Sequence, residues 1–563
     1  MSRIRSISIH NYRAIKNLYQ DFGEERFIVL IGRGDSGKST ILSAIHAALN
    51  PSWNASFSDL DFYNQDTSNP IEIILVIDEL PDELFKETQF GFYMNDNGQE
   101  NPKLFSLKVK LVVDSTLEPH WYACGNQELG IEDKPISAQS RASIGVNFIT
   151  DYADTHFAYN RQSPLYALTK ASLEDDVKIE HIKFQVLRDL SSKVDKEKMA
   201  PLNTPLGSLK STARMLGLSI EDLRVSMDIS ENPYTGNSIA LHHNGLPYRT
   251  QGKGSKRLMS IAIQSELTKT GGIVLIDEIE QGLEPDRITT LVRILKGTNS
   301  GQIFITTHSL NVILEAEPKS LFVVRQGDDC LFQVPDSLDA CRRSNPQALF
   351  SRKIICCEGK TEFGIWREID RRLNAVEPRC FSSVGVALVN SNGGNNMYTY
   401  SMGLKSLGYD VCIFADNDTN QEKAIAKVEA ADIPVFICDD GNCIEKQIIN
   451  DLPWDYVIKL IECPQENFPS KNIDISDELM QRITNSSSES QLELRREIGK
   501  LSVYKEKKPN GKIVSHEWFK HIPGGEFLGS LIFDYWTDQS FTKDNKLCDL
   551  IKSVLEWSYG KSE

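Results

Sequence analysis

The sequence predicts an α/β fold divided into several domains, on three observations. A glycine-rich loop at 32–40 lies between an apolar strand and a helix. A second apolar strand, 272–276, ends in two carboxylates. After about residue 350, strands and helices alternate again, and acidic residues again follow the strands. Parallel sheets built from such alternation place their ligand sites at the carboxyl ends of the strands, so two separate sites are expected.

Length and composition are those of a soluble protein. A chain of 563 residues is too long for one hydrophobic core and predicts roughly two to four domains. We find no run of about 18 apolar residues, so no membrane span is expected. The 11 cysteines lack any CxxC pair, which favours buried thiols in a reducing cytoplasm. A formal charge of −16 argues against a chain coated in nucleic acid but allows a local basic groove.

The glycine-rich loop matches the G-x-x-x-x-G-K-[ST] phosphate-binding motif at every position. Its glycines allow backbone N–H groups to turn towards an anion, and the start of the following helix adds partial positive charge. Lys38 is expected to reach the β- and γ-phosphates of a nucleoside triphosphate, and Ser39 to bind Mg²⁺. The residues expected to bind ATP here are Gly32, Gly34, Asp35, Ser36, Gly37, Lys38, Ser39 and Thr40.

Two further motifs predict the rest of this nucleotide site. Asp277 and Glu278 close an apolar strand, which is the Walker B arrangement. Asp277 is expected to sit on Mg²⁺ through water, and Glu278 to orient the attacking water as a catalytic residue. His308 follows another apolar strand and is expected to sense the γ-phosphate. The alternatives are a salt-bridged strand end for the carboxylates and a structural role for the histidine.

The order of these motifs resembles the ABC-type ATPases of the RecF/SMC/Rad50 group, over residues 1 to about 345. The signature element would be 250–257, which departs from the LSGGQ of that group and places Gly252 where its serine is expected, followed by Gly254. Residues 282–285 resemble the D-loop. In that group the signature of one subunit completes the ATP site of the other, so the resemblance implies at least a homodimer. The charged, helical stretch 166–218 is either a dimerisation element or a solvated lid.

A second set of carboxylates follows two later strands. Glu358 closes the first strand of this part of the chain, and Glu362 comes one helical turn later. Asp416 and Asp418 follow a third strand and would share a face if that strand continued. Four converging carboxylates repel one another unless a divalent cation lies among them, and hard oxygen ligands favour Mg²⁺ or Mn²⁺.

This pattern resembles the Toprim domain of topoisomerases, primases and nucleases. Glu445, which opens a helix, matches a further acidic position of the nuclease members. An ABC ATPase followed by Toprim is similar to the OLD (overcoming lysogenisation defect) family, which includes Gabija-type and retron-associated nucleases. The resemblance implies a metal-dependent DNA endonuclease under nucleotide control, often in anti-phage defence, with a possible helicase-like or retron partner encoded nearby.

The resemblance also implies a catalytic lysine beyond the Toprim core. The densest basic stretch of the chain spans 500–520, and within it Lys520 is the preferred residue and Lys512 the second choice. A solvated charged face is the alternative for any single lysine. As a group these lysines would neutralise DNA phosphates and make binding sensitive to salt.

We therefore expect an ATPase and a metal-dependent DNA endonuclease in one cytoplasmic chain. The metal ligands would be Glu358, Glu362, Asp416, Asp418 and Glu445 in the second site, and Ser39 and Asp277 in the first. The expected domains are 1–160 and 221–348 for the ATPase, 161–220 for a helical insertion, 349–465 for the Toprim core and 466–563 for a mainly helical extension. The rival hypotheses are a DNA-repair or chromosome-maintenance ATPase whose Toprim domain only binds DNA, and a topoisomerase-like enzyme, which would need a tyrosine nucleophile in a further domain.

Overall fold

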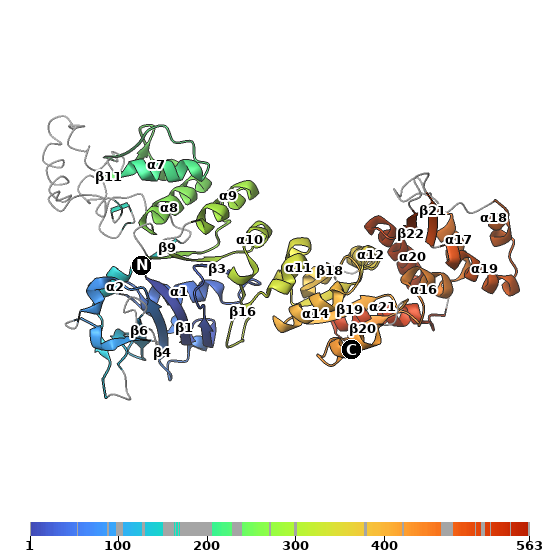
Figure 1. Cartoon of the computed structure of the whole chain (residues 1–563), viewed down its shortest axis with the longest axis horizontal. Helices are drawn as coiled ribbons and strands as arrows, with labels where there is room; N and C mark the ends of the chain where they lie inside the picture. The colour runs from blue at the N-terminus through green and yellow to red at the C-terminus, as the bar shows by residue number, and fades with distance from the viewer. Residues whose placement is uncertain are drawn as a thin grey trace. The chain divides into compact units, whose positions relative to one another are not determined.

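The chain forms two compact units, Met1–Val334 and Pro335–Glu563, which Figure 1 colours by residue number. This computed structural model describes residues 2–149, 205–227, 239–297, 301–462 and 477–560 with short internal gaps, and a few residues near 165. Most of the expected helical insertion lies outside the described residues, although α7 (Leu206–Met215) belongs to it. Across the described parts, no helix is long and apolar enough to cross a membrane.

The first unit contains the parallel sheet that carries the nucleotide motifs. Its order is β16-β15-β3-β14-β13-β9, and β16 pairs antiparallel with β15. The strands are β3 (Phe27–Ile31), β9 (Val146–Ile149), β13 (Ile273–Ile276), β14 (Gln302–Thr306), β15 (Leu321–Val323) and β16 (Phe332–Gln333). β14 lies between β3 and β13, and all three run parallel. The carboxyl ends of these strands therefore lie at the same edge of the sheet, and that edge carries the phosphate loop, Asp277 and His308.

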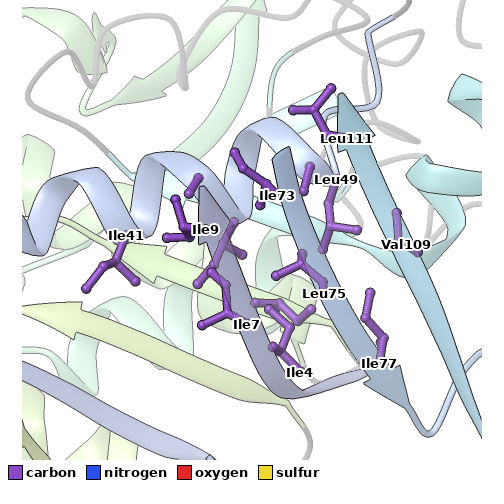
Figure 2. Close-up of a cluster of buried hydrophobic side chains, with 14 of the residues drawn as sticks. Ile4, Ile7, Ile9, Ile41, Leu49, Ile73, Leu75, Ile77, Val109 and Leu111 are labelled. Atoms are coloured by element: carbon purple, nitrogen blue, oxygen red, sulfur yellow. The ribbon is translucent and has the colours of Figure 1, made fainter. Parts of the chain in front are cut away.

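A second, antiparallel sheet of this unit has the order β2-β1-β4-β6-β7-β8, with β5 beside β6. Its strands are β1 (Arg3–Tyr12), β2 (Ile15–Asp21), β4 (Ile71–Asp78), β5 (Met94–Asn95), β6 (Ser106–Val113), β7 (Pro119–Ala123) and β8 (Lys134–Pro135). Alternate residues of β4 are buried, as expected for a sheet with one face on the core. Figure 2 shows aliphatic side chains of β1, β4 and β6 gathered beside Ile41 and Leu49.

The helix α1 (Lys38–Ala48) links the two sheets. It contacts β1, β4 and β6 of the antiparallel sheet and β9, β13 and β14 of the parallel sheet. Its buried residues are Lys38, Ile41, Leu42, Ala44, Ile45 and Ala48. Because aliphatic residues cover it from both sides, the helix that begins at the phosphate loop is fixed by the core.

The remaining elements of the first unit surround these two sheets. The helices are α2 (Ala138–Ile144), α8 (Lys253–Thr268), α9 (Pro285–Lys296) and α10 (Leu310–Glu315). A three-stranded antiparallel sheet is formed by β10 (Leu223–Met227), β11 (Ile239–His243) and β12 (Leu246–Pro247). Of these helices, α8 begins within the signature-like segment and leads into β13, so it joins two of the predicted nucleotide motifs.

The second unit is built on a four-stranded parallel sheet of order β18-β17-β19-β20. The strands are β17 (Lys353–Cys357), β18 (Val386–Asn390), β19 (Asp410–Ala415) and β20 (Val435–Ile437). The helices of this core are α11 (Asp339–Ser344), α12 (Lys360–Val376), α13 (Phe381–Val384), α14 (Asn396–Ser406), α15 (Glu422–Glu429), α16 (Ile444–Asp451) and α17 (Trp454–Ile461).

The C-terminal extension of this unit is mainly helical. It contains α18 (Asp477–Thr484), α19 (Ser488–Leu501), α20 (Ile522–Thr537) and α21 (Lys546–Tyr559), and a hairpin of β21 (Val503–Lys507) and β22 (Ile513–Glu517). The predicted fold class, α/β in both parts with a helical extension, is confirmed.

Glycines bring α12 and α20 into close contact. A Cβ at Gly364 would lie 2.8 Å from the Cα of Gly525, and one at Gly529 would lie 2.7 Å from the carbonyl oxygen of Ile365. Real side chains do not approach so closely, so these positions require glycine. Because α12 begins beside Glu358 and α20 begins just after Lys520, this packing sets the distance between two predicted parts of the acidic site.

Gly525→Ala is expected to destabilise the second unit by about 3 kcal/mol, because the added methyl collides with the backbone of α12. Chemical unfolding followed by tryptophan fluorescence measures the change. Gly499→Ala is the matched control: its Cβ would meet only the Cγ of Lys446, at 3.9 Å. That substitution should leave stability unchanged or raise it by up to about 1 kcal/mol. Equal unfolding midpoints for Gly525→Ala and Gly499→Ala would contradict the close packing of α12 against α20.

Candidate nucleotide-binding and acidic sites

The phosphate loop has a backbone that depends on its glycines. A Cβ at Gly32, whose φ is 149°, would collide with the carbonyl oxygen of Val324. Gly37 precedes α1 with a φ of 99°. The Lys38 ammonium donates to the carbonyl oxygens of Gly32 and Arg33, at 3.1 and 2.6 Å. Burial lowers the pKa of Lys38, and the charges of nearby acidic residues oppose that shift. The ammonium is therefore bound to carbonyl oxygens of the loop, and a bound phosphate would compete with them for it.

Asp277 joins the two halves of the nucleotide site. Its Oδ1 accepts hydrogen bonds from the hydroxyl of Ser39 at 2.9 Å and from that of Thr306 at 2.6 Å. The N–H of Glu278 also donates to the Thr306 hydroxyl, at 2.8 Å, and Glu278 has a φ of 46° with an exposed side chain. The structure thus brings together Ser39, Asp277 and Glu278. Sequence reasoning missed Thr306, whose only signal was a hydroxyl at the end of the neighbouring strand.

His308 is held in place by a carboxylate that the sequence did not single out. The N–H of His308 and the hydroxyl of Thr307 both donate to Glu280, which lies two residues after Glu278. Burial, and then the charge of Lys38, lower the pKa of His308. The imidazole is therefore neutral near pH 7, and a neutral imidazole still has one ring N–H that can donate to a phosphate.

Gly252 and Gly254 lie at the start of α8. The carbonyl of Gly252 accepts the Lys256 N–H at 3.0 Å. A Cβ at Gly254 would lie 2.6 Å from the carbonyl oxygen of Gly282. The signature-like segment therefore packs against the D-loop-like segment of the same chain.

The acidic site begins where β17 and β19 end side by side. The N–H of Asp416 donates to Oε2 of Glu358 at 3.1 Å. Glu362, in the first turn of α12, accepts the Gly359 N–H at 2.9 Å through Oε2. Among the described residues, its Oε1 is buried without a hydrogen-bond partner. Asp416 accepts the Ile444 N–H at 2.6 Å, which places Glu445 of the same helix start at the site.

Burial raises the pKa of every carboxyl in this group. Burial and then the charge of Asp416 raise the pKa of Glu358 to about 7 and hold that of Glu362 well above its usual range. Burial likewise raises the pKa of Asp416 and of Glu445, and Lys520 partly opposes it. Burial is the main cause of these shifts, and the charges of neighbouring carboxylates add to it.

Lys520 reaches this group from the C-terminal extension. Its Nζ is 3.2 Å from Oδ2 of Asp416 and 3.3 Å from Oε2 of Glu445. Burial alone would lower the pKa of Lys520, but the charges of Glu445, Asp416 and Glu362 outweigh it and raise the pKa far above its usual range. The lysine is therefore a permanent cation among the carboxylates. Lys512, the second choice, lies outside the described residues.

Asp418 does not share a face with Asp416. β19 ends at Ala415, and the chain then bends so that Asp416 is buried and Asp418 is exposed. The condition for a shared face, that the strand continues through both residues, is not met, and Asp416 instead accepts the Ile444 N–H. The charge of Asp418 still contributes to the raised pKa of Glu358. Asp418 therefore lies near the rim of the group.

The donor set suits a hard divalent cation. It consists of carboxylate oxygens, and two of them, Oε1 of Glu362 and Oε2 of Glu445, are buried without a hydrogen-bond partner among the described residues. Within the described residues, no three His, Cys, Asp or Glu side chains are arranged so that they could hold a metal ion. The ammonium of Lys520 lies between two of the carboxylates instead. A bound cation would therefore require small side-chain movements around Lys520.

Three protein-family models match parts of the chain. The AAA ATPase domain matches residues 3–111, and the AAA domain described as putative AbiEii toxin, Type IV TA system, matches 174–315. The overcoming lysogenization defect protein-like TOPRIM domain matches 349–418. No curated protein matches the chain.

The solved structures that match the chain include SMC head domains and the recombination mediator RecF. An SMC head bound to the C-winged helix domain of ScpA has 15% identity and a TM-score of 0.37, covering 60% of this chain and 99% of its own. The SMC head domain from Thermotoga maritima has 14% identity and a TM-score of 0.31, covering 59% and 99%. The recombination mediator RecF with ATP has 13% identity and a TM-score of 0.37, covering 59% and 98%.

Proposed function

We propose that this chain, in which an ABC-type ATPase is fused to an OLD-like Toprim domain as in the OLD family, is an ATP-regulated, divalent-metal-dependent DNA endonuclease. The observation that carries the proposal is the group of Glu358, Glu362, Asp416 and Glu445 around Lys520. A buried set of like charges is unfavourable for folding, and it is typical of sites that bind a cation or perform catalysis.

The residues of this group have distinct roles in the proposal. Glu358, Glu362, Asp416 and Glu445 would hold Mg²⁺ or Mn²⁺, with Asp418 at the rim. When bound, such a cation lowers the pKa of its water and stabilises the leaving oxygen of a phosphodiester. Lys520 is a permanent cation beside them and would stabilise the negative charge that develops on the phosphate. The DNA backbone carries that charge in every sequence, so the chemistry needs no base contact.

The nucleotide site acts as the control input in this proposal. The phosphate loop from Gly32 to Thr40 would bind ATP, with Ser39 and Asp277 on Mg²⁺ and Glu278 and His308 at the γ-phosphate. Gly252 and Gly254 of the signature-like segment would complete the site of a partner subunit in a homodimer, as the family resemblance implies. We further propose a cytoplasmic role in anti-phage defence, with a helicase-like or retron-encoded partner, as the family resemblance implies.

Removal of divalent metal is expected to abolish plasmid cleavage. Purified protein with supercoiled plasmid and Mg²⁺ or Mn²⁺ should yield nicked or linear DNA, and EDTA should reduce the rate at least about a hundredfold. Gel electrophoresis measures the products, and re-addition of metal in excess of EDTA should restore them. Intact plasmid under every metal and nucleotide condition would contradict the proposal.

The ion pairs of Lys520 support one rival function. An ammonium already balances Asp416 and Glu445, which would also suit a Toprim domain that only binds DNA beside a DNA-repair ATPase. The plasmid experiment separates the two: ATP turnover with DNA binding but without cleavage favours the rival. Religated topoisomers in place of nicked products would indicate a topoisomerase-like enzyme.

A further inference from the structure

Thr361 lies in the first turn of α12, between Glu358 and Glu362, and is 1% exposed. Its hydroxyl is 3.0 Å from the carbonyl oxygen of Phe519 and 3.3 Å from Oε1 of Glu445. A hydroxyl has one proton and donates to one acceptor at a time. The nearer acceptor belongs to the residue that precedes Lys520, so Thr361 links the turn that carries Glu362 to the loop that carries the lysine.

Contacts of Phe519 and His521 also fix the backbone on both sides of Lys520. Phe519 has a φ of 56°, which is uncommon for a bulky residue, and its ring stacks on Phe527 at 5.9 Å. The His521 N–H donates to the same Phe519 carbonyl at 2.6 Å, so Lys520 is the centre of a tight turn. The ring of His521 accepts the Gly524 N–H at 2.8 Å and caps α20. Lys520 thus projects from a short segment whose backbone is fixed at several points.

We propose that Thr361 is a positioning residue for Lys520: its hydroxyl fixes the Phe519 carbonyl and thereby places the Lys520 ammonium against Asp416 and Glu445. A lysine has a flexible four-carbon stem, so its charge is placed well only if its backbone is placed well. Displacement of a reacting group by about 1 Å costs on the order of a hundredfold in rate. The kinetic test of this inference rests on the proposed nuclease function. The placement of the loop is tested by a second measurement that does not require DNA cleavage.

The kinetic test compares Thr361→Val with Thr361→Ser. Valine keeps the shape and burial of the side chain and removes the hydroxyl, whereas serine keeps the hydroxyl. We expect Thr361→Val to lower kcat for plasmid cleavage about 10- to 100-fold, with KM for DNA within about twofold of wild type. Thr361→Ser should stay within about fivefold of wild-type kcat. Lys520→Met gives the rate without the ammonium, and Thr361→Val should not fall below it.

The second measurement is amide hydrogen exchange in metal-free and DNA-free protein. Thr361→Val should exchange at least about tenfold faster than wild type over 519–525, with α21 unchanged, and Thr361→Ser should match wild type. Unchanged exchange at 519–525, or unchanged kcat in Thr361→Val, overturns the inference. Faster exchange throughout the unit also overturns it, because that result indicates a merely structural role. If Thr361→Val exchanges faster at 519–525 but the wild-type protein never cleaves DNA, the nuclease proposal is overturned. The placement of the loop by Thr361 then still stands.

Discussion

A Glu362→Gln variant is expected to lose DNA cleavage by at least about a thousandfold, while its metal-free fold becomes more stable than wild type. The loss corresponds to about 4 kcal/mol of transition-state stabilisation, because the amide has no negative charge for the cation. Among the described residues, Oε1 of Glu362 and Oε2 of Glu445 are buried without a hydrogen-bond partner, but the Glu445 oxygen lies 3.3 Å from the Lys520 ammonium. The Glu362 oxygen is therefore the freer of the two to bind a metal ion.

The gain in stability follows from the direction of the pKa shift. Burial and the charge of Asp416 raise the pKa of Glu362 in the folded state. An acid whose pKa is raised by folding holds its proton more tightly when folded, so it lowers stability progressively as pH rises above its ordinary value of 4.5. At pH 7 the carboxyl therefore opposes folding, and the neutral amide removes that penalty. We expect the melting temperature of the metal-free variant to rise by about 2–5 °C.

Two measurements check this prediction together. Plasmid cleavage gives the rate, and thermal unfolding in EDTA at pH 5 and pH 7 gives the stability. The difference in melting temperature between variant and wild type should be larger at pH 7 than at pH 5. Glu429→Gln, an exposed acid on α15, is the control and should change neither quantity. A Glu362→Gln protein that cuts DNA at the wild-type rate would remove Glu362 from the catalytic site.

The sequence was most informative where a motif coincides with a strand end. Glu358 and Asp416 follow strands that are neighbours in a parallel sheet, so their proximity follows from the topology. Asp277 and Ser39 also meet at the carboxyl ends of one parallel sheet, although β14 lies between the strands that lead to them. Whether Asp416 and Asp418 share a face stayed open, because the end of a strand cannot be located to one residue from an apolar pattern. The inward turn of Asp416 depends on the Ile444 N–H, which the local sequence does not show.

Contacts between distant segments were beyond prediction. Lys520 was chosen through a family resemblance, and among several lysines nothing local distinguished it. Its place is set by the glycine packing of α12 against α20, whose members are about 160 positions apart. Glu280, Thr306 and Thr361 are polar residues inside recognised motifs, yet their partners lie on other elements. A single sequence gives no measure of which hydroxyl or carboxylate will meet which backbone group.

Lys38→Ala is expected to remove nucleotide control while leaving the acidic site intact. The ammonium of Lys38 is the buried cation of the phosphate loop and donates to Gly32 and Arg33. Without it, ATP should bind about 10- to 100-fold more weakly, because a charge-assisted hydrogen bond to phosphate is lost. Cleavage by wild type should change at least about fivefold when ATP is added, whereas cleavage by Lys38→Ala should not change at the same ATP concentration.

The residues of the acidic site all belong to the second compact unit, and Lys38 belongs to the first. Mn²⁺ binding by the nucleotide-free Lys38→Ala protein, measured by calorimetry, should therefore match wild type, and so should its cleavage rate without ATP. Lys108→Ala, at an exposed position of β6, is the control and should retain the response to ATP. If Lys38→Ala lost Mn²⁺ binding or all cleavage without ATP, the phosphate loop would have to support the nuclease chemistry itself rather than regulate it.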